Sequence, residues 1–145
     1  MSPADDGHAH IASARIARPA TVALAFLTDP QNLASWALTR GGVEILSDDL
    51  VKGIATGDGS DVYVRILNPV ASDAVYYLVG GDPDSLVPRI MVQVMAGPYL
   101  QAGDNSCVVS LLAWRSDDWG DDRWQALVEA HETEILQIRD LIEAT

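Results

Sequence analysis

The sequence predicts an α+β protein in which a seven-stranded antiparallel sheet is covered by one long C-terminal helix. Two observations predict this class. Seven short runs rich in β-branched, aromatic or alternating apolar residues are separated by glycine, proline, aspartate and asparagine, as in strands joined by turns. Residues 121–145 instead repeat apolar side chains at steps of three and four, which is the spacing of one buried helix face.

The N-terminal part of the chain is expected to hold one strand and two short helices. Residues 8–17 alternate loosely between apolar and polar side chains and form the first strand. The first helix covers residues 21–28, with Thr21 as its N-cap. The second covers residues 30–38, where Asp29 is the cap and a proline takes the first helical position.

Six further strands are expected to continue the sheet as a meander, in which each strand pairs with the next. Their expected ranges are 43–47, 50–56, 62–67, 74–79, 87–96 and 107–115. An antiparallel sheet of this length must curl or pack one face on something. The C-terminal helix is the only large apolar element available to it, so we expect a curved sheet around that helix, with space between them.

Composition bounds the domain organisation and the partners. A chain of 145 residues is expected to form a single domain, residues 8–145, after a frayed leader of residues 1–7. Its net charge of −12 argues against nucleic acid and anionic lipid as partners, because both need clustered lysine and arginine. The lone cysteine, Cys107, is expected to be a buried thiol. No apolar run is long enough for membrane insertion, and we predict a cytoplasmic protein; a homo-oligomer is left open.

Two segments carry a family resemblance. The opening "ARIARPATVALAFLTDPQNLASW" and the ending "DDRWQALVEAHETEILQIRDLIEA" resemble the START-like superfamily, also called SRPBCC, which includes polyketide cyclase/dehydratase-like proteins and relatives of the birch-pollen allergen. Asp29, Pro30 and Trp36 stand where the family pattern has its Asp-Pro and tryptophan. The resemblance implies the helix-grip fold, in which a curved seven-stranded sheet grips the C-terminal helix around an apolar cavity.

His131 is the candidate catalytic residue, because it is the one titratable side chain in the apolar stripe of the C-terminal helix. The stripe consists of Trp124, Leu127, Val128, His131, Ile135, Ile138 and Ile142. A neutral imidazole beside an apolar cavity can act as general acid or base on a carbonyl compound. The alternative, which the sequence favours, is a core histidine hydrogen-bonded to a backbone carbonyl or a tyrosine.

The strands offer ligand contacts on either of two faces. One face carries Arg65, Arg89 and other mixed side chains, and the opposite face is apolar. A solvated outer surface is favoured for the mixed face, although its methionines and Trp114 also suit a cavity. Core packing is favoured for Trp36 and Trp124. The predicted ligand contacts are Trp36, Tyr63, Tyr77, Arg89, Met91, Tyr99 (as a gate), Trp114 and Trp124.

No cofactor or metal ion is expected. The carboxylates Asp117, Asp118, Asp121 and Asp122 lack the spacing of a calcium loop and are expected to cap the last helix.

Three functions remain open. The leading hypothesis is the binding of a small hydrophobic or aromatic metabolite between sheet and helix. The first alternative is a cyclase, dehydratase or hydrolase that uses His131. The second is an interaction protein of the co-chaperone type, which would use its outer surface.

Overall fold

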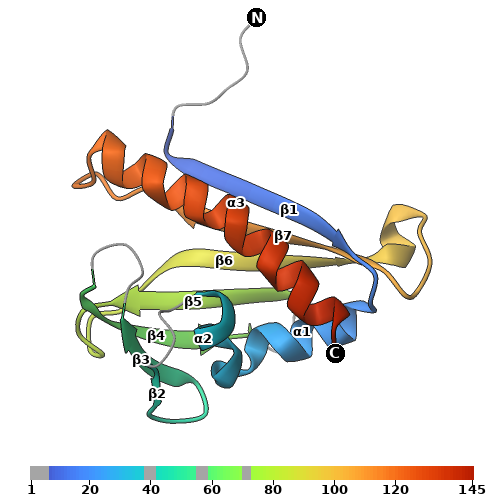
Figure 1. Ribbon diagram of the computed structural model, residues 1–145, viewed down its shortest axis with the longest axis horizontal. Coiled ribbons are helices and arrows are strands. Elements are labelled where there is room, and N and C mark those ends of the chain that lie inside the picture. Colours follow the sequence, from blue (N-terminus) through green and yellow to red (C-terminus); the bar gives the residue numbers. More distant parts are fainter. Residues whose placement is uncertain (1–6, 38–41, 55–58, 70–72) are drawn as a thin grey trace, which may run out of the picture.

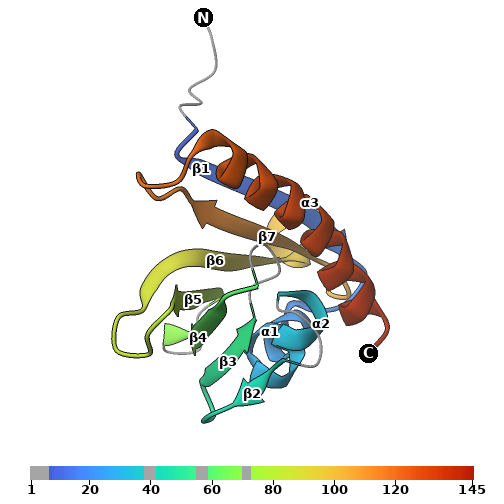
Figure 2. The same cartoon turned by 60° about the vertical axis from the view of Figure 1, so that its left-hand side comes forward.

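The computed structural model describes residues 7–37, 42–54, 59–69 and 73–145. A seven-stranded antiparallel sheet curves around one side of a long C-terminal helix, α3 (Asp121–Glu143), as Figures 1 and 2 show. The strands are β1 (Ala9–Ile16), β2 (Glu44–Ile45), β3 (Leu50–Ile54), β4 (Asp61–Leu67), β5 (Ala74–Gly80), β6 (Val87–Ala96) and β7 (Cys107–Trp114). The predicted α+β helix-grip architecture is confirmed.

The order across the sheet is β1-β7-β6-β5-β4-β3-β2. Strands β2 to β7 form the predicted meander, and β1 closes the other edge by pairing along its whole length with β7. From β3 onward, each meander strand pairs antiparallel with the strand before it in the chain. Helix α3 packs over β1 and β7, so the last element of the chain covers the sheet edge formed by the first (Figure 2).

The two short helices between β1 and β2 differ in detail from the prediction. Helix α1 (Ala20–Thr28) begins one residue early, and its N-cap is Pro19, so the prediction of Thr21 as the cap is wrong. The second helix is a 3-10 turn, η1 (Pro30–Asn32), followed by one α-helical turn, α2 (Leu33–Trp36).

The predicted cap at the second of these helices is correct. The Asp29 carboxylate accepts a hydrogen bond from the Gln31 backbone N–H at 3.0 Å. Parts of three other predictions lie outside the described residues: the leader over residues 1–6, the end of the helix at residue 38 and the end of the strand at residues 55–56.

The apolar face of the sheet is the concave one, as the sequence favoured. Val64, Val92 and Leu111 are buried from three neighbouring strands, and Ile135 and Ile138 of α3 are buried against the same core. The alternating side chains, such as Arg65 of β4 and Gln93 of β6, point to the outer surface and stay partly exposed. The sheet is therefore one-sided, and its inner face is the one that packs against α3.

One irregularity in β6 changes the direction of its first residues. Tyr77 of β5 pairs with Ile90, but Val79 pairs with Val87, so Pro88 and Arg89 both face the single residue between them. This is a β-bulge, and proline is tolerated there because it has no N–H to donate to the ladder. The bulge breaks the alternation of the strand, so Arg89 does not share the outer face with Met91.

The start of α3 is capped differently from the prediction. Its N-cap is Gly120, and no side chain accepts a capping hydrogen bond from the first turn. The prediction that the four carboxylates cap the helix through hydrogen bonds is therefore wrong. Asp121 and Asp122 do lie in the first turn, where carboxylates interact favourably with the helix dipole. Asp121 also accepts a hydrogen bond from Arg115 at 2.9 Å, which ties the helix start to the end of β7.

Candidate functional site

A pocket of about 520 Å³ lies between the inner face of the sheet and the first half of α3, closed on one side by α2. Its wall is mainly apolar. The apolar and aromatic wall consists of Leu33, Trp36, Ala37, Val62, Val64, Tyr77, Val79, Ile90, Trp119 and Leu127. The remaining wall consists of Ser60, Asp61, Gly80, Gly81, Arg89, Arg123, His131 and Glu134. A mostly apolar cleft of this volume with a few polar groups is typical of small-molecule sites.

His131 lies in the pocket wall and is 5% exposed. Its Nε2 atom is 3.8 Å from Oε2 of Glu134, which lies one turn further along α3 and also lines the pocket. This separation is too long for a hydrogen bond. The Nδ1 atom of His131 is buried and has no hydrogen-bond partner among the described residues. The expected core histidine, bonded to a carbonyl or a tyrosine, is therefore not what the described residues contain.

Burial moves the pKa values of these two groups in opposite directions. Burial lowers the pKa of His131 to about 4, with a smaller effect from nearby His10. Burial raises the pKa of Glu134 to about 8. At pH 7 the pair is therefore a neutral imidazole beside a neutral carboxylic acid, that is, a proton acceptor beside a proton donor.

Tyr77 and Trp36 form the inner end of the pocket. The Tyr77 hydroxyl donates a hydrogen bond of 2.7 Å to the backbone oxygen of Leu27, and burial raises the pKa of this hydroxyl. The Trp36 ring meets the Tyr77 ring edge-on at 5.4 Å between centroids. Because its only donor is used, Tyr77 offers a ligand an aromatic surface and not a free proton.

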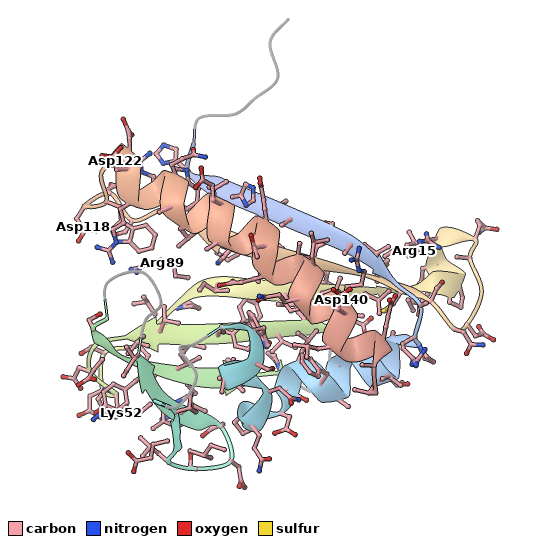
Figure 3. The ribbon with its side chains drawn as sticks, in the orientation of Figure 1. Arg15, Lys52, Arg89, Asp118, Asp122 and Asp140 are labelled. Atoms are coloured by element: carbon pink, nitrogen blue, oxygen red, sulfur yellow. The ribbon has the colours of Figure 1, made fainter. Side chains whose placement is uncertain are left out.

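The opening of the pocket carries two arginines and a tryptophan. The Arg89 and Arg123 guanidinium carbons lie 5.0 Å and 4.6 Å from the centroid of the Trp119 ring. Arg89 reaches this position because of the bulge in β6, and Arg123 comes from the first turn of α3. Figure 3 shows Arg89 beside Asp118 at the end of the molecule where α3 begins.

The pocket thus brings together four of the side chains predicted from the sequence. These are Trp36, Tyr77, Arg89 and His131.

Five other predicted contacts do not line the pocket. Tyr63 lies on the outer face of β4, where the Lys52 ammonium group is 5.7 Å from its ring. Met91 and Trp114 occupy the same outer face of β6 and β7. Trp124 is buried in a small separate cluster with Ala113 and Trp119. The interpretation of these side chains as wall residues is not supported by their positions.

Tyr99 lies at the opposite end of the sheet from the pocket opening. It belongs to a 3-10 turn, η3 (Gly97–Leu100), after the last residue of β6, whereas Arg89 stands near the first residue of the same strand (Figure 1). Its side chain is 74% exposed. The proposed role as a cavity gate therefore has no support from its location.

Glu134, Trp119 and Arg123 are wall residues that the sequence reasoning missed. Glu134 follows His131 by three residues, and side chains at this spacing share one helix face. That spacing could have identified it as a neighbour. Trp119 and Arg123 come from the turn before α3 and from its first turn, where no periodic pattern indicates direction.

Comparison with known proteins identifies the fold through structure alone. No family model and no curated protein sequence matches the chain. Among solved structures, it is similar to XoxI from Bacillus cereus, with a TM-score of 0.68, 11% identity, and coverage of 93% of this chain and 95% of that one.

Two further similar structures carry more informative names. One is a START superfamily protein from Mycobacterium smegmatis, with a TM-score of 0.61, 10% identity, and coverage of 94% and 95%. The other is the Aha1 dimer from Colwellia psychrerythraea, with a TM-score of 0.62, 14% identity, and coverage of 92% and 96%. None of the helices among the described residues is both long and apolar enough to cross a bilayer. The chain has the START-like helix-grip fold.

Proposed function

We propose that the protein binds a small, mainly apolar or aromatic molecule in the pocket between β4, β5, β6 and α3. The observation that carries the proposal is the pocket itself, with a volume of about 520 Å³ and a mainly apolar wall. A well-packed domain has few voids larger than a water molecule, and an unfilled apolar space lowers stability. A bound apolar molecule would supply the van der Waals contacts that the side chains of the pocket wall otherwise lack.

The test is to fill the pocket and measure binding of an uncharged aromatic probe, 1-naphthylacetamide, by calorimetry. Leu127 of α3 lines the pocket, so Leu127→Trp should reduce the affinity at least about tenfold, because the larger ring occupies the probe's space. Leu136 lies on the same helix, does not line the pocket and is 46% exposed. Leu136→Trp is therefore the matched control and should bind as the unmodified protein does.

The contrary result is equally clear. If the probe does not bind, or if both tryptophan variants bind it as well as the unmodified protein, the pocket is not a ligand site of this kind. Melting curves of both variants separate loss of binding from loss of folding.

A second candidate function is acid–base catalysis on a carbonyl compound, and one observation favours it. His131 and Glu134 line the same pocket, and burial leaves one as a base and the other as an acid near neutral pH. Pairs of groups whose pKa values are moved apart in this way are typical of catalytic acid–base assignments. In an enolisation, His131 would take the proton from the carbon next to the carbonyl, and Glu134 would give its proton to the carbonyl oxygen.

Deuterium exchange tests this second function without knowledge of the natural substrate. The probe is 2-acetylnaphthalene in heavy water, and the readout is deuterium in its methyl group by mass spectrometry. His131→Ala and Glu134→Gln should each lower the exchange rate about a hundredfold while the probe still binds. An exchange rate no faster than in protein-free buffer, or one unchanged in both variants, contradicts the assignment.

A further inference from the structure

The two arginines at the pocket opening are grouped around one aromatic ring. The guanidinium carbons of Arg89 and Arg123 both lie within about 5 Å of the Trp119 ring centroid, so they belong to one small patch. Contact between a guanidinium plane and an aromatic face holds the cation in place and leaves the N–H groups at its edge free to donate.

These donors make no hydrogen bond within the part of the chain that the structure describes. Neither Arg89 nor Arg123 makes a hydrogen bond or an ion pair with any other residue that the structure describes. Some other arginines of the chain do have such partners. Arg18, for example, donates to the backbone oxygen of Glu143 at 2.6 Å, and Arg65 pairs with Asp49 at 3.1 Å.

Their position makes them accessible from both the solvent and the pocket. Both line the pocket, Arg89 is half-buried, and Arg123 is exposed, which places them at its opening. The acidic groups nearby are Asp61, which also lines the opening, and Asp118, whose hydroxyl partner is Ser116. Besides its hydrogen bond with Ser116, Asp118 has its pKa lowered by the charges of Arg123 and Arg89. Two cations thus face two carboxylates, Asp61 in the wall and Asp118 beside the opening, in a chain whose overall charge is −12.

We propose that the ligand is an amphiphile with one carboxylate, whose apolar or aromatic body fills the inner pocket and whose carboxylate is held at the opening by Arg89 and Arg123. This inference rests on the proposed binding function and adds the chemical class of the ligand. A planar guanidinium matches a carboxylate with two parallel hydrogen bonds. A strongly acidic protein repels anions in general, so a carboxylate ligand needs such a local cationic patch to bind.

A matched pair of probes isolates the carboxylate. 1-Naphthylacetate and 1-naphthylacetamide have the same ring and almost the same size, and only the first is charged. The unmodified protein should bind the acetate about tenfold more tightly than the amide by calorimetry. Arg89→Gln should remove about tenfold of the acetate affinity, and Arg123→Gln about threefold, since Arg123 is more exposed to water. Both variants should bind the amide normally.

The control variant is Arg139→Gln. Arg139 lies on the same helix as Arg123, does not line the pocket and pairs with Asp140 at 3.0 Å, so its loss should leave both probes unaffected. Equal affinities for acetate and amide would overturn the carboxylate proposal and leave apolar binding intact. The same conclusion follows if the arginine variants weaken both probes alike, because the arginines would then only maintain the shape of the opening. If the amide also fails to bind, the proposed function fails, and the carboxylate proposal fails with it.

Discussion

His131 and Glu134 illustrate how burial alone sets the chemistry of a side chain. Both lie on the pocket face of α3 and are largely removed from water, and no described residue forms a hydrogen bond that would stabilise the charged form of either. The sequence located His131 because a histidine stands out in an apolar stripe. It did not locate Glu134, because a glutamate on an amphipathic helix is usually assigned to the solvated face.

The raised pKa of Glu134 has a consequence for stability. The pKa is about 8 in the folded protein, against 4.5 for an unperturbed glutamate. Unfolding therefore releases its proton at neutral pH, and the stability that the neutral form contributes is complete below pH 4.5 and lost as pH rises through 8. Glu134→Gln, which stays neutral, should exceed the unmodified protein by about 3 kcal/mol in unfolding free energy at pH 7.

Urea unfolding at pH 5 and pH 7 checks this prediction. The difference between the two proteins should be small at pH 5 and large at pH 7, and Glu129→Gln, at an exposed site on the same helix, should show neither effect. A variant that is less stable than the unmodified protein at pH 7 would indicate a charged pair between His131 and Glu134 in place of a neutral one. His131 acts in the opposite direction, because its lowered pKa costs stability as pH falls from 6.5 through 4.

At the scale of elements, the sequence predicted nearly all helices and strands, because the turn residues and the two periodicities are strong local signals. It predicted β6 with its observed bounds and α3 to within two residues. The direction of Arg89 was harder, because strict alternation places it on the outer face with Met91. Pro88, directly before it, was the signal for the bulge that brings Arg89 to the pocket.

In the connection from β6 to β7, Gly97 lies so close to neighbouring backbone atoms that a side chain does not fit there. At Gly97, a Cβ atom would lie 2.2 Å from the backbone oxygen of Gly103 and 2.7 Å from that of Ser106. Gly97→Ala should therefore cost about 2 kcal/mol of unfolding free energy, because the backbone must move apart. Gly103→Ala is the control, since a Cβ atom there meets nothing within 4 Å. Thermal unfolding measures both, and equal melting temperatures would contradict the close approach.

At the scale of the whole molecule, the fold and the pocket follow from one arrangement. A one-sided sheet that curves around a helix buries the middle of both and leaves a space where they diverge, at the end where α3 begins (Figure 2). The sequence could predict that such a space exists, but not at which end of the sheet it opens. Tyr99 follows the far end of β6, away from the pocket, whereas Trp36 and Tyr77 line it.

The most direct measurement of the central claim, that this pocket is the ligand site, is a nuclear magnetic resonance titration with 1-naphthylacetamide. Because the probe is uncharged, the result does not depend on the arginines. We predict that the largest shifts occur at the Trp36 indole N–H and at the backbone amides of Val64, Tyr77 and Leu127, which surround the pocket. Shifts confined to the outer face, at Ile11 and Trp114, or no shifts at all, would contradict the claim.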